Sequence, residues 1–156
     1  MRKLRLTGCL LWYQRKRGVE VEIKFRGKRV DNGEWVEGYY VGDYDGKHYI
    51  TQPLKDSHRL IQVNPATVGQ GVEINGKWYF EGDIVRMHYF FENYDPSTLG
   101  AFEDEEVIIG TVGIDELGTC TENEDGKYYW LKYIQEPSEE IEIIGNIHDN
   151  GDLLHG

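Results

Sequence analysis

From residue 19 onward the chain alternates between apolar and polar residues, which is typical of a half-buried β-strand. The first apolar positions are Val19, Val21, Ile23 and Phe25, and charged residues stand between them. The same period predicts further strands, and these cover residues 35–41, 48–51, 59–63, 72–74, 77–80, 84–90, 107–114, 128–134 and 141–147. Short helical turns are predicted only at 65–68, 96–99 and 137–140, each of which begins with Pro.

Five dipeptides of the hairpin-turn kind separate these segments. A two-residue type I′ turn needs positive φ at both central positions, which Gly adopts freely and Asn or Asp adopt at small cost. Gly38 lies inside a predicted strand, where it indicates a bulge or a close approach of another backbone. The dipeptides are Asn32-Gly33, Asp45-Gly46, Asn75-Gly76, Asp125-Gly126 and Asn150-Gly151.

These patterns predict a mainly β protein with few short helical turns. We expect an N-terminal β meander over residues 19–68, joined to a small SH3-like β-barrel over residues 72–147. The barrel is suggested by an apolar strand, a Glu81-Gly82-Asp83 turn and a later strand that contains Gly110. The expected core consists of Ile23, Phe25, Trp35, Val36, Ile50, Ile61, Ile84, Val85, Val112, Tyr129, Leu131, Ile143 and Ile147.

Charge is distributed unevenly over the 156 residues, which carry a net charge of −11. Residues 1–18 sum to +6, residues 19–86 to −2 and residues 87–156 to −15. A surface this acidic repels phosphate, so we expect no direct nucleic-acid binding by the folded part. Two Cys residues far apart in the chain exclude a disulfide framework and a four-cysteine zinc site, and they are consistent with a reduced, cytoplasmic protein.

The basic segment 1–18 has two interpretations. It is either a disordered N-terminal extension or the product of a mis-assigned start, in which case the native chain begins at Val19. The Leu6-Thr7-Gly8-Cys9 sequence matches a lipoprotein cleavage pattern, but the apolar stretch that must precede the cleavage site is missing. The chain also has no apolar run long enough to cross a bilayer, so we expect no membrane partner.

Several segments resemble the YopX family of phage and prophage proteins. Residues 23–27 (Ile-Lys-Phe-Arg-Gly) are similar to the opening of the family, and residues 63–70, 81–85 and 144–150 to its middle, its barrel turn and its close. The resemblance runs from about residue 19 to residue 154, and residues 1–18 have no counterpart in it. It implies a mainly β fold and a phage or prophage accessory protein in the cytoplasm of a bacterial host. It supplies no activity and no catalytic residues.

No catalytic, cofactor or metal motif stands out in the sequence. His148 and Asp149 are adjacent, and we interpret them as a structural turn rather than an acid–base pair. The segment 43–46 lacks the alternating ligands of a calcium loop and is predicted to be a turn. Glu81, Asp83 and His148 could form a site only if the fold brought them together. We therefore expect no cofactor and no metal.

The acidic segment 102–106 is the one candidate interaction surface. Its carboxylates belong to Glu103, Asp104, Glu105 and Glu106, and the plainest interpretation is a solvated loop between strands. The alternative is that they mimic nucleic-acid phosphates for a host protein. We thus expect a non-enzymatic binding or assembly module with an unknown protein partner or a second copy. An acidic modulator of a host nucleic-acid-binding protein ranks second, and an enzyme ranks third.

Overall fold

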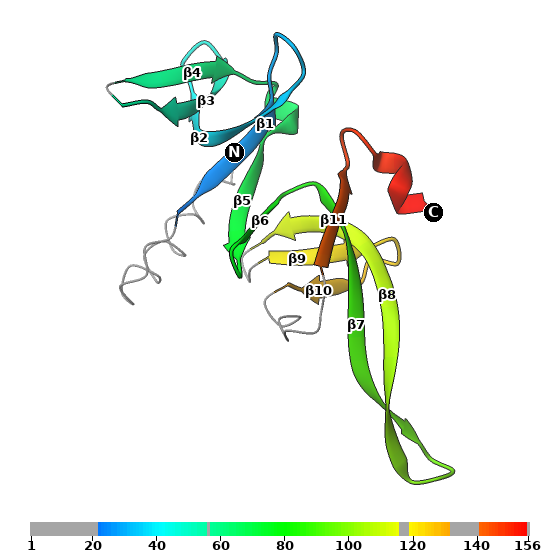
Figure 1. Cartoon of the computed structure of the whole chain (residues 1–156). Helices are drawn as coiled ribbons and strands as arrows, with labels where there is room; N and C mark the ends of the chain where they lie inside the picture. Colours follow the sequence, from blue (N-terminus) through cyan, green and yellow to red (C-terminus); the bar gives the residue numbers. More distant parts are fainter. Residues whose placement is uncertain (1–21, 56, 116–118, 132–140, 156) are drawn as a thin grey trace. The chain divides into compact units, whose positions relative to one another are not determined.

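The computed structural model describes residues 22–55, 57–115, 119–131 and 141–155 (Figure 1). The chain divides into two compact units, residues 1–78 and 79–156. In the described residues, strands and two short 3-10 helices make up the regular structure, so the prediction of a mainly β fold is confirmed. The predicted basic extension 1–18 and the helical turn at 137–140 lie outside the described residues.

The N-terminal sheet has the strand order β4-β3-β2-β1-β5-β6, and its first four strands form the predicted meander. Strand β1 is antiparallel to both β2 and β5. Phe25 in β1 pairs with Gly38 of β2 on one side and with Gln70 of β5 on the other. The strands are β1 (Lys24–Lys28), β2 (Trp35–Gly42), β3 (His48–Pro53), β4 (His58–Gln62), β5 (Gly69–Ile74) and β6 (Lys77–Phe80).

A small apolar cluster holds this sheet together. The predicted core residues Val36, Ile50 and Ile61 are buried in it, and Val63, which we had not predicted, joins them. Phe25 packs against the cluster but is only partly buried. The predicted core residues Ile23 and Trp35 are also only partly buried. The sequence thus places the core correctly but overestimates the burial of the larger side chains at its margin.

Gly38 lies where the pairing of β2 changes from one neighbouring strand to another. Before it β2 pairs with β1, and after it the pairing passes to β3, starting with Tyr39 opposite Thr51. Gly38 has a φ of 158°, and a Cβ atom there would lie 2.3 Å from the carbonyl oxygen of Thr51. No side chain fits in that space, so the predicted close backbone approach is confirmed.

The sheet of the C-terminal unit has the order β10-β9-β8-β7-β11. It is open in the described residues, with β10 and β11 at opposite edges, so the closure that an SH3-like barrel requires is not seen. Residues 132–140, which join the two edge strands, lie outside the described residues. The strands are β7 (Asp83–Asp95), β8 (Gly100–Ile114), β9 (Thr119–Asn123), β10 (Tyr128–Trp130) and β11 (Ile141–Asn146).

The core of this unit contains most of the predicted side chains. Fully buried members that the sequence identified are Ile84, Val85, Val112 and Leu131, while Tyr129 and Ile143 are half-buried. The sequence missed Met87, Ile108 and Cys120. The prediction for Ile147 was wrong, because it lies in the turn after β11 and is 41% exposed.

Four of the five turn dipeptides lie in turns between strands, but of these only Asn75-Gly76 has the positive φ at both residues that a type I′ turn requires. The φ values are 52° for Asn75 and 79° for Gly76. Gly33, Gly46 and Gly126 also have positive φ in turns. The fifth, Asn150-Gly151, instead leads into the 3-10 helix η2 (Gly151–His155).

The predicted helical turns differ in outcome. Residues 65–68 contain the 3-10 helix η1 (Pro65–Thr67), which Asn64 caps by accepting the N–H of Ala66 at 3.1 Å. Residues 96–99 form a hairpin turn and no helix, so that prediction was wrong. The turn connects two strands of 13 and 15 residues, β7 and β8, which are much longer than the predicted segments 84–90 and 107–114.

Candidate functional site

The outer part of the β7–β8 hairpin extends beyond the rest of its sheet (Figure 1). On β7 the pairing with β11 reaches only as far as Met87, and on β8 the pairing with β9 begins at Gly110. Between these limits, residues 88–107 pair only with one another among the described residues. We call residues 88–107 the hairpin arm. At about 3.3 Å per residue, each of its eight-residue strands is roughly 26 Å long.

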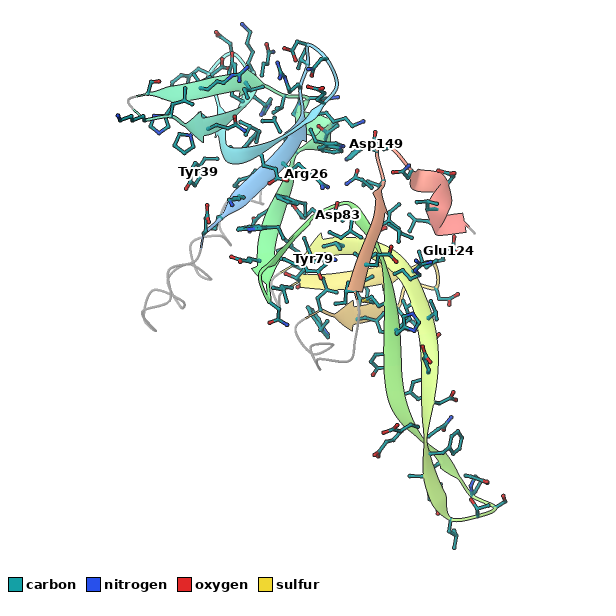
Figure 2. The ribbon with its side chains drawn as sticks, in the orientation of Figure 1. Arg26, Tyr39, Tyr79, Asp83, Glu124 and Asp149 are labelled. Carbon is teal, nitrogen blue, oxygen red and sulfur yellow. The ribbon has the colours of Figure 1, made fainter. Side chains whose placement is uncertain are left out.

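The predicted acidic residues are exposed, as expected, but they lie in a strand of this arm, so the prediction of a loop was wrong. The pairing register sorts them by face, because residues directly opposite each other point to the same side. Glu103 and Glu105 lie on one face, and Asp104 and Glu106 on the other. The four carboxylates therefore do not form one cluster but are divided between the two faces of the ribbon. Figure 2 shows side chains along the whole length of the ribbon.

Among the described residues, Glu105 is the one of these four carboxylates that contacts a basic side chain. The arm contains six Asp or Glu residues and no Lys or Arg. Glu103 lies directly opposite Glu92, which is an unfavourable pair of like charges. Glu105 contacts the Nδ1 atom of His88, whose side chain is 43% exposed. His88 is thus an edge residue that partners a carboxylate, and the arm as a whole remains negatively charged.

Aromatic rings fix the base of the arm to the sheet. Tyr89 lies edge-on to Tyr129 of β10, with ring centroids 5.6 Å apart, and stacks on Phe91 at 5.9 Å. Burial raises the pKa of the Tyr129 hydroxyl, and the carboxylate of Glu106 raises it further. A two-stranded ribbon is only marginally stable by itself, so these contacts support the arm at its base.

Farther out, the arm exposes large apolar side chains that the sequence analysis did not identify. The exposed fractions are 57% for Tyr94, 77% for Leu99, 47% for Phe102 and 53% for Val107. Exposed aromatic side chains on a projecting element are typical anchors of protein interfaces. The signal that could have found them is the aromatic run 89–91 followed by the Asp95-Pro96-Ser97 turn, which together indicate a strand that continues to residue 95.

The tip of the arm is held by Asp95. Its Oδ1 atom accepts hydrogen bonds from the N–H of Ser97 at 2.8 Å and from the Ser97 hydroxyl at 2.7 Å. These bonds, with others from Thr98, lower the pKa of the Asp95 carboxyl. Leu99 completes the turn with a φ of 54°, an unusual value for a residue with a side chain. The tip is therefore an ordered turn that displays Leu99.

Asp83 and His148 both take part in hydrogen bonds that involve Asn146. Asp83 is 1% exposed, and its carboxylate accepts the N–H of Phe80 at 2.9 Å and the side-chain amide of Asn146 at 3.4 Å. His148 and Asp149 lie in the turn after β11, as predicted, where the His148 N–H donates to the Asn146 side chain at 3.0 Å. Through its hydrogen bonds Asp83, which is labelled in Figure 2, organises the Glu81-Gly82-Asp83 turn.

The described residues contain no group of three or more His, Cys, Asp or Glu side chains that could hold a metal ion. The segment 43–46 is a turn, as predicted, in which the Asp43 side chain accepts the N–H groups of Asp45 and Lys47 at 3.0 and 2.7 Å. In the part of the chain that the structure describes, no helix is long and apolar enough to cross a membrane.

Comparison with known proteins gives no assignment. No family model, no curated protein and no solved structure matches the chain. The resemblance to the YopX family therefore stays a prediction from the segments that carry it. The hairpin arm is the candidate site on which a functional proposal rests.

Proposed function

We propose that the chain is a non-enzymatic binding module that docks onto a partner protein through the hairpin arm. The observation that carries this proposal is that residues 88–107 pair with no other described strand and also expose large apolar side chains. An unpaired row of backbone N–H and C=O groups is a template for another chain, and soluble proteins normally cover or shorten such edges. A projecting ribbon of this kind is best explained by a partner that covers it.

Charge defines the chemistry of that partner. Six carboxylates without a Lys or Arg repel a second copy of the same arm and also repel nucleic acid. They favour a protein surface rich in Lys and Arg, with an apolar recess for Phe102 or Leu99. Pairing of such a partner with Glu92 and Glu103 would also remove the repulsion between these two residues. A second copy of this chain is accordingly the less favoured occupant of the arm.

A shortened arm provides the test. Tyr89 and Glu106 are directly opposite each other, so residues 90–105 can be replaced by Asn-Gly to close the hairpin with a type I′ turn. Pull-downs with the full chain and with this variant are compared by mass spectrometry at low and moderate salt. We expect a partner with a basic surface that the full chain captures and the shortened chain does not. A partner retained equally by both chains would contradict docking through the arm.

A second candidate function is mimicry of nucleic acid. Glu103 and Glu105 lie on the same face about 6.6 Å apart along the strand, and Glu92 lies opposite Glu103. A repeated row of carboxylates of this kind could occupy the phosphate-binding surface of a nucleic-acid-binding protein. The captured partner would then release the chain when duplex DNA is added. Release by DNA favours the mimic, and retention favours an assembly module.

The resemblance to the YopX family supports a cellular setting for these experiments. We propose that the chain is an accessory protein of a phage or prophage that acts in the cytoplasm of its bacterial host. Lysates of phage-infected and uninfected host cells therefore serve as paired sources of partners. A partner found only in the infected lysate would be a phage protein and would favour assembly.

A further inference from the structure

A separate region of positive charge lies in the N-terminal unit. An open cavity of about 400 Å³ is lined by the turns after β1 and β2 and by the segment after β4. This volume is within the usual range for small-molecule sites. We call it the cationic cavity. Its lining residues are Lys28, Arg29, Val30, Gly33, Gly46, Lys47, His48, Gln62, Val63, Asn64 and Pro65.

The lining has a sign opposite to that of the protein. Three of its residues, Lys28, Arg29 and Lys47, are cationic, and none is Asp or Glu, whereas the whole chain carries −11. Arg29 is partly neutralised, because its guanidinium donates to the Asp31 carboxylate at 2.9 and 2.6 Å and lies 4.0 Å from the carboxylate of Glu34. The hydrogen bond lowers the pKa of Asp31 and fixes Arg29 at the margin of the cavity. The lysines supply the remaining charge.

The backbone of Lys47 is held in place by Asp43. Its N–H donates to the Asp43 side chain at 2.7 Å, and its carbonyl accepts the Asp43 N–H at 2.9 Å. The backbone of Lys47 is therefore fixed, and among the described residues no carboxylate pairs with its exposed ammonium.

The ring of His48 adds a further polar group to the lining. It stacks on Tyr40, with centroids 5.7 Å apart and planes 12° apart, and its Nδ1 atom contacts the Tyr40 hydroxyl. Burial raises the pKa of the Tyr40 hydroxyl. Where Nδ1 accepts the hydrogen of that hydroxyl, the other ring nitrogen, Nε2, carries a hydrogen and is a donor.

Side-chain amides complete the set of donors. Asn64 uses its Oδ1 atom to accept the N–H of Ala66 at 3.1 Å, which leaves its NH₂ group as the donor. Gln62 contributes a second amide to the lining. Lysine ammonium groups together with neutral N–H donors are a common arrangement for phosphate oxygens.

We infer that the cationic cavity binds a small phosphate-bearing anion. Lys47 supplies the main unpaired charge, and His48, Gln62 and Asn64 supply hydrogen bonds to the oxygens. The lack of carboxylates in the lining excludes a divalent cation as the primary ligand, because hard cations need oxygen ligands of that kind. A volume of about 400 Å³ is too small for a duplex but admits a pyrophosphate or a mononucleotide.

Titration calorimetry with inorganic pyrophosphate tests this inference on the full chain. Lys47→Glu reverses the charge in the cavity, and Lys55→Glu makes the same change on an exposed residue of the same unit outside the lining. We expect saturable binding by the wild type, at least tenfold weaker binding by K47E, and unchanged binding by K55E. Equal weakening by both variants, or no saturable binding by the wild type, would overturn the inference.

Two further measurements define the ligand class. His48→Phe keeps the stacking on Tyr40 but removes the ring donor, so we expect a several-fold loss of pyrophosphate affinity with an unchanged circular dichroism spectrum. Citrate serves as a carboxylate probe of similar charge, and binding as tight as that of pyrophosphate would overturn the phosphate assignment. The chain with the shortened arm should bind pyrophosphate as the full chain does. Failure of the docking proposal would therefore leave this inference unaffected, and the reverse also holds.

Discussion

Glu92 and Glu103 lie directly opposite each other on one face of the hairpin arm. Like charges at such a cross-strand position destabilise the pair, and salt or a cationic partner can reduce that effect. The arm therefore keeps an arrangement that weakens it in isolation. Binding to a basic surface offers a physical reason for this arrangement, because the same two carboxylates would then contribute favourable interactions.

The substitution Glu103→Lys separates the effect of Glu103 on the stability of the arm from its effect on partner binding. It converts the like-charge pair with Glu92 into an opposite-charge pair, so we expect the unfolding free energy to rise by about 0.2–1 kcal/mol. Binding of the partner should weaken, because a positive charge would then face its basic surface. Urea unfolding and the pull-down measure these two outcomes. Glu73→Lys, an exposed site on β5, is the matched control and should leave partner binding unchanged.

The arm also shows where the sequence pattern misled the prediction. A run of four acidic residues has no alternation, so it was assigned to a loop. In the structure these residues are held in register by the opposite strand, whose aromatic residues Tyr89 and Phe91 face Glu106 and Asp104. The strand thus depends on its neighbour rather than on its own period, and a one-dimensional pattern does not contain that information.

Gly38 permits a second clear prediction. In Gly38→Ala the new methyl group would meet the Thr51 carbonyl oxygen at 2.3 Å, and the φ of 158° is unfavourable for a residue with a side chain. We expect a loss of at least about 1–3 kcal/mol of unfolding free energy. Thermal or urea unfolding measures it.

Gly42 provides the control within the same strand. A Cβ there would meet only the His48 ring, at 3.8 Å, so Gly42→Ala should change stability by less than about 0.5 kcal/mol. If Gly38→Ala were as stable as Gly42→Ala, the close approach of β2 and β3 at Gly38 would be contradicted.

The meander was predictable because each of its determinants is local. Alternation places Val36 and Ile50 on the buried face, and the dipeptides Asn32-Gly33 and Asp45-Gly46 fix the turns between strands. The cationic cavity was not predictable, since Lys47 and Gln62 are 15 positions apart in the sequence and are united only by the pairing of β3 with β4. Local patterns thus specify strands and turns, whereas sites depend on the pairing of strands.

Asp83 is expected to contribute to stability through its buried hydrogen bonds. Asp83→Ala would leave the Phe80 N–H without its acceptor, at a cost of about 1–3 kcal/mol. Asp83→Asn keeps one side-chain oxygen for that N–H and should cost less. Urea unfolding of the two variants gives the comparison, and an alanine variant as stable as the wild type would contradict the structural role of this carboxylate.

Cys120 makes stability depend on pH in the alkaline range. It is 4% exposed, and burial, followed by the negative charges of Asp115 and Glu122, raises the pKa of its thiol. The unfolded chain therefore loses the thiol proton at a lower pH than the native protein. Its contribution to stability is fully present below the ordinary thiol pKa of 9.0 and is lost as the pH rises through the native pKa.

Comparison of the wild type with Cys120→Ala isolates this contribution from the tyrosines that titrate in the same range. We expect the difference in unfolding free energy between the two proteins to be constant near pH 7 and to shrink as the pH rises above about 9. In a Cys9→Ser background, which leaves Cys120 as the single thiol, a disulfide reagent should react slowly with the native protein and rapidly in urea, because the thiolate is the reactive form. Rapid reaction of the native protein at neutral pH would contradict a buried thiol with a raised pKa.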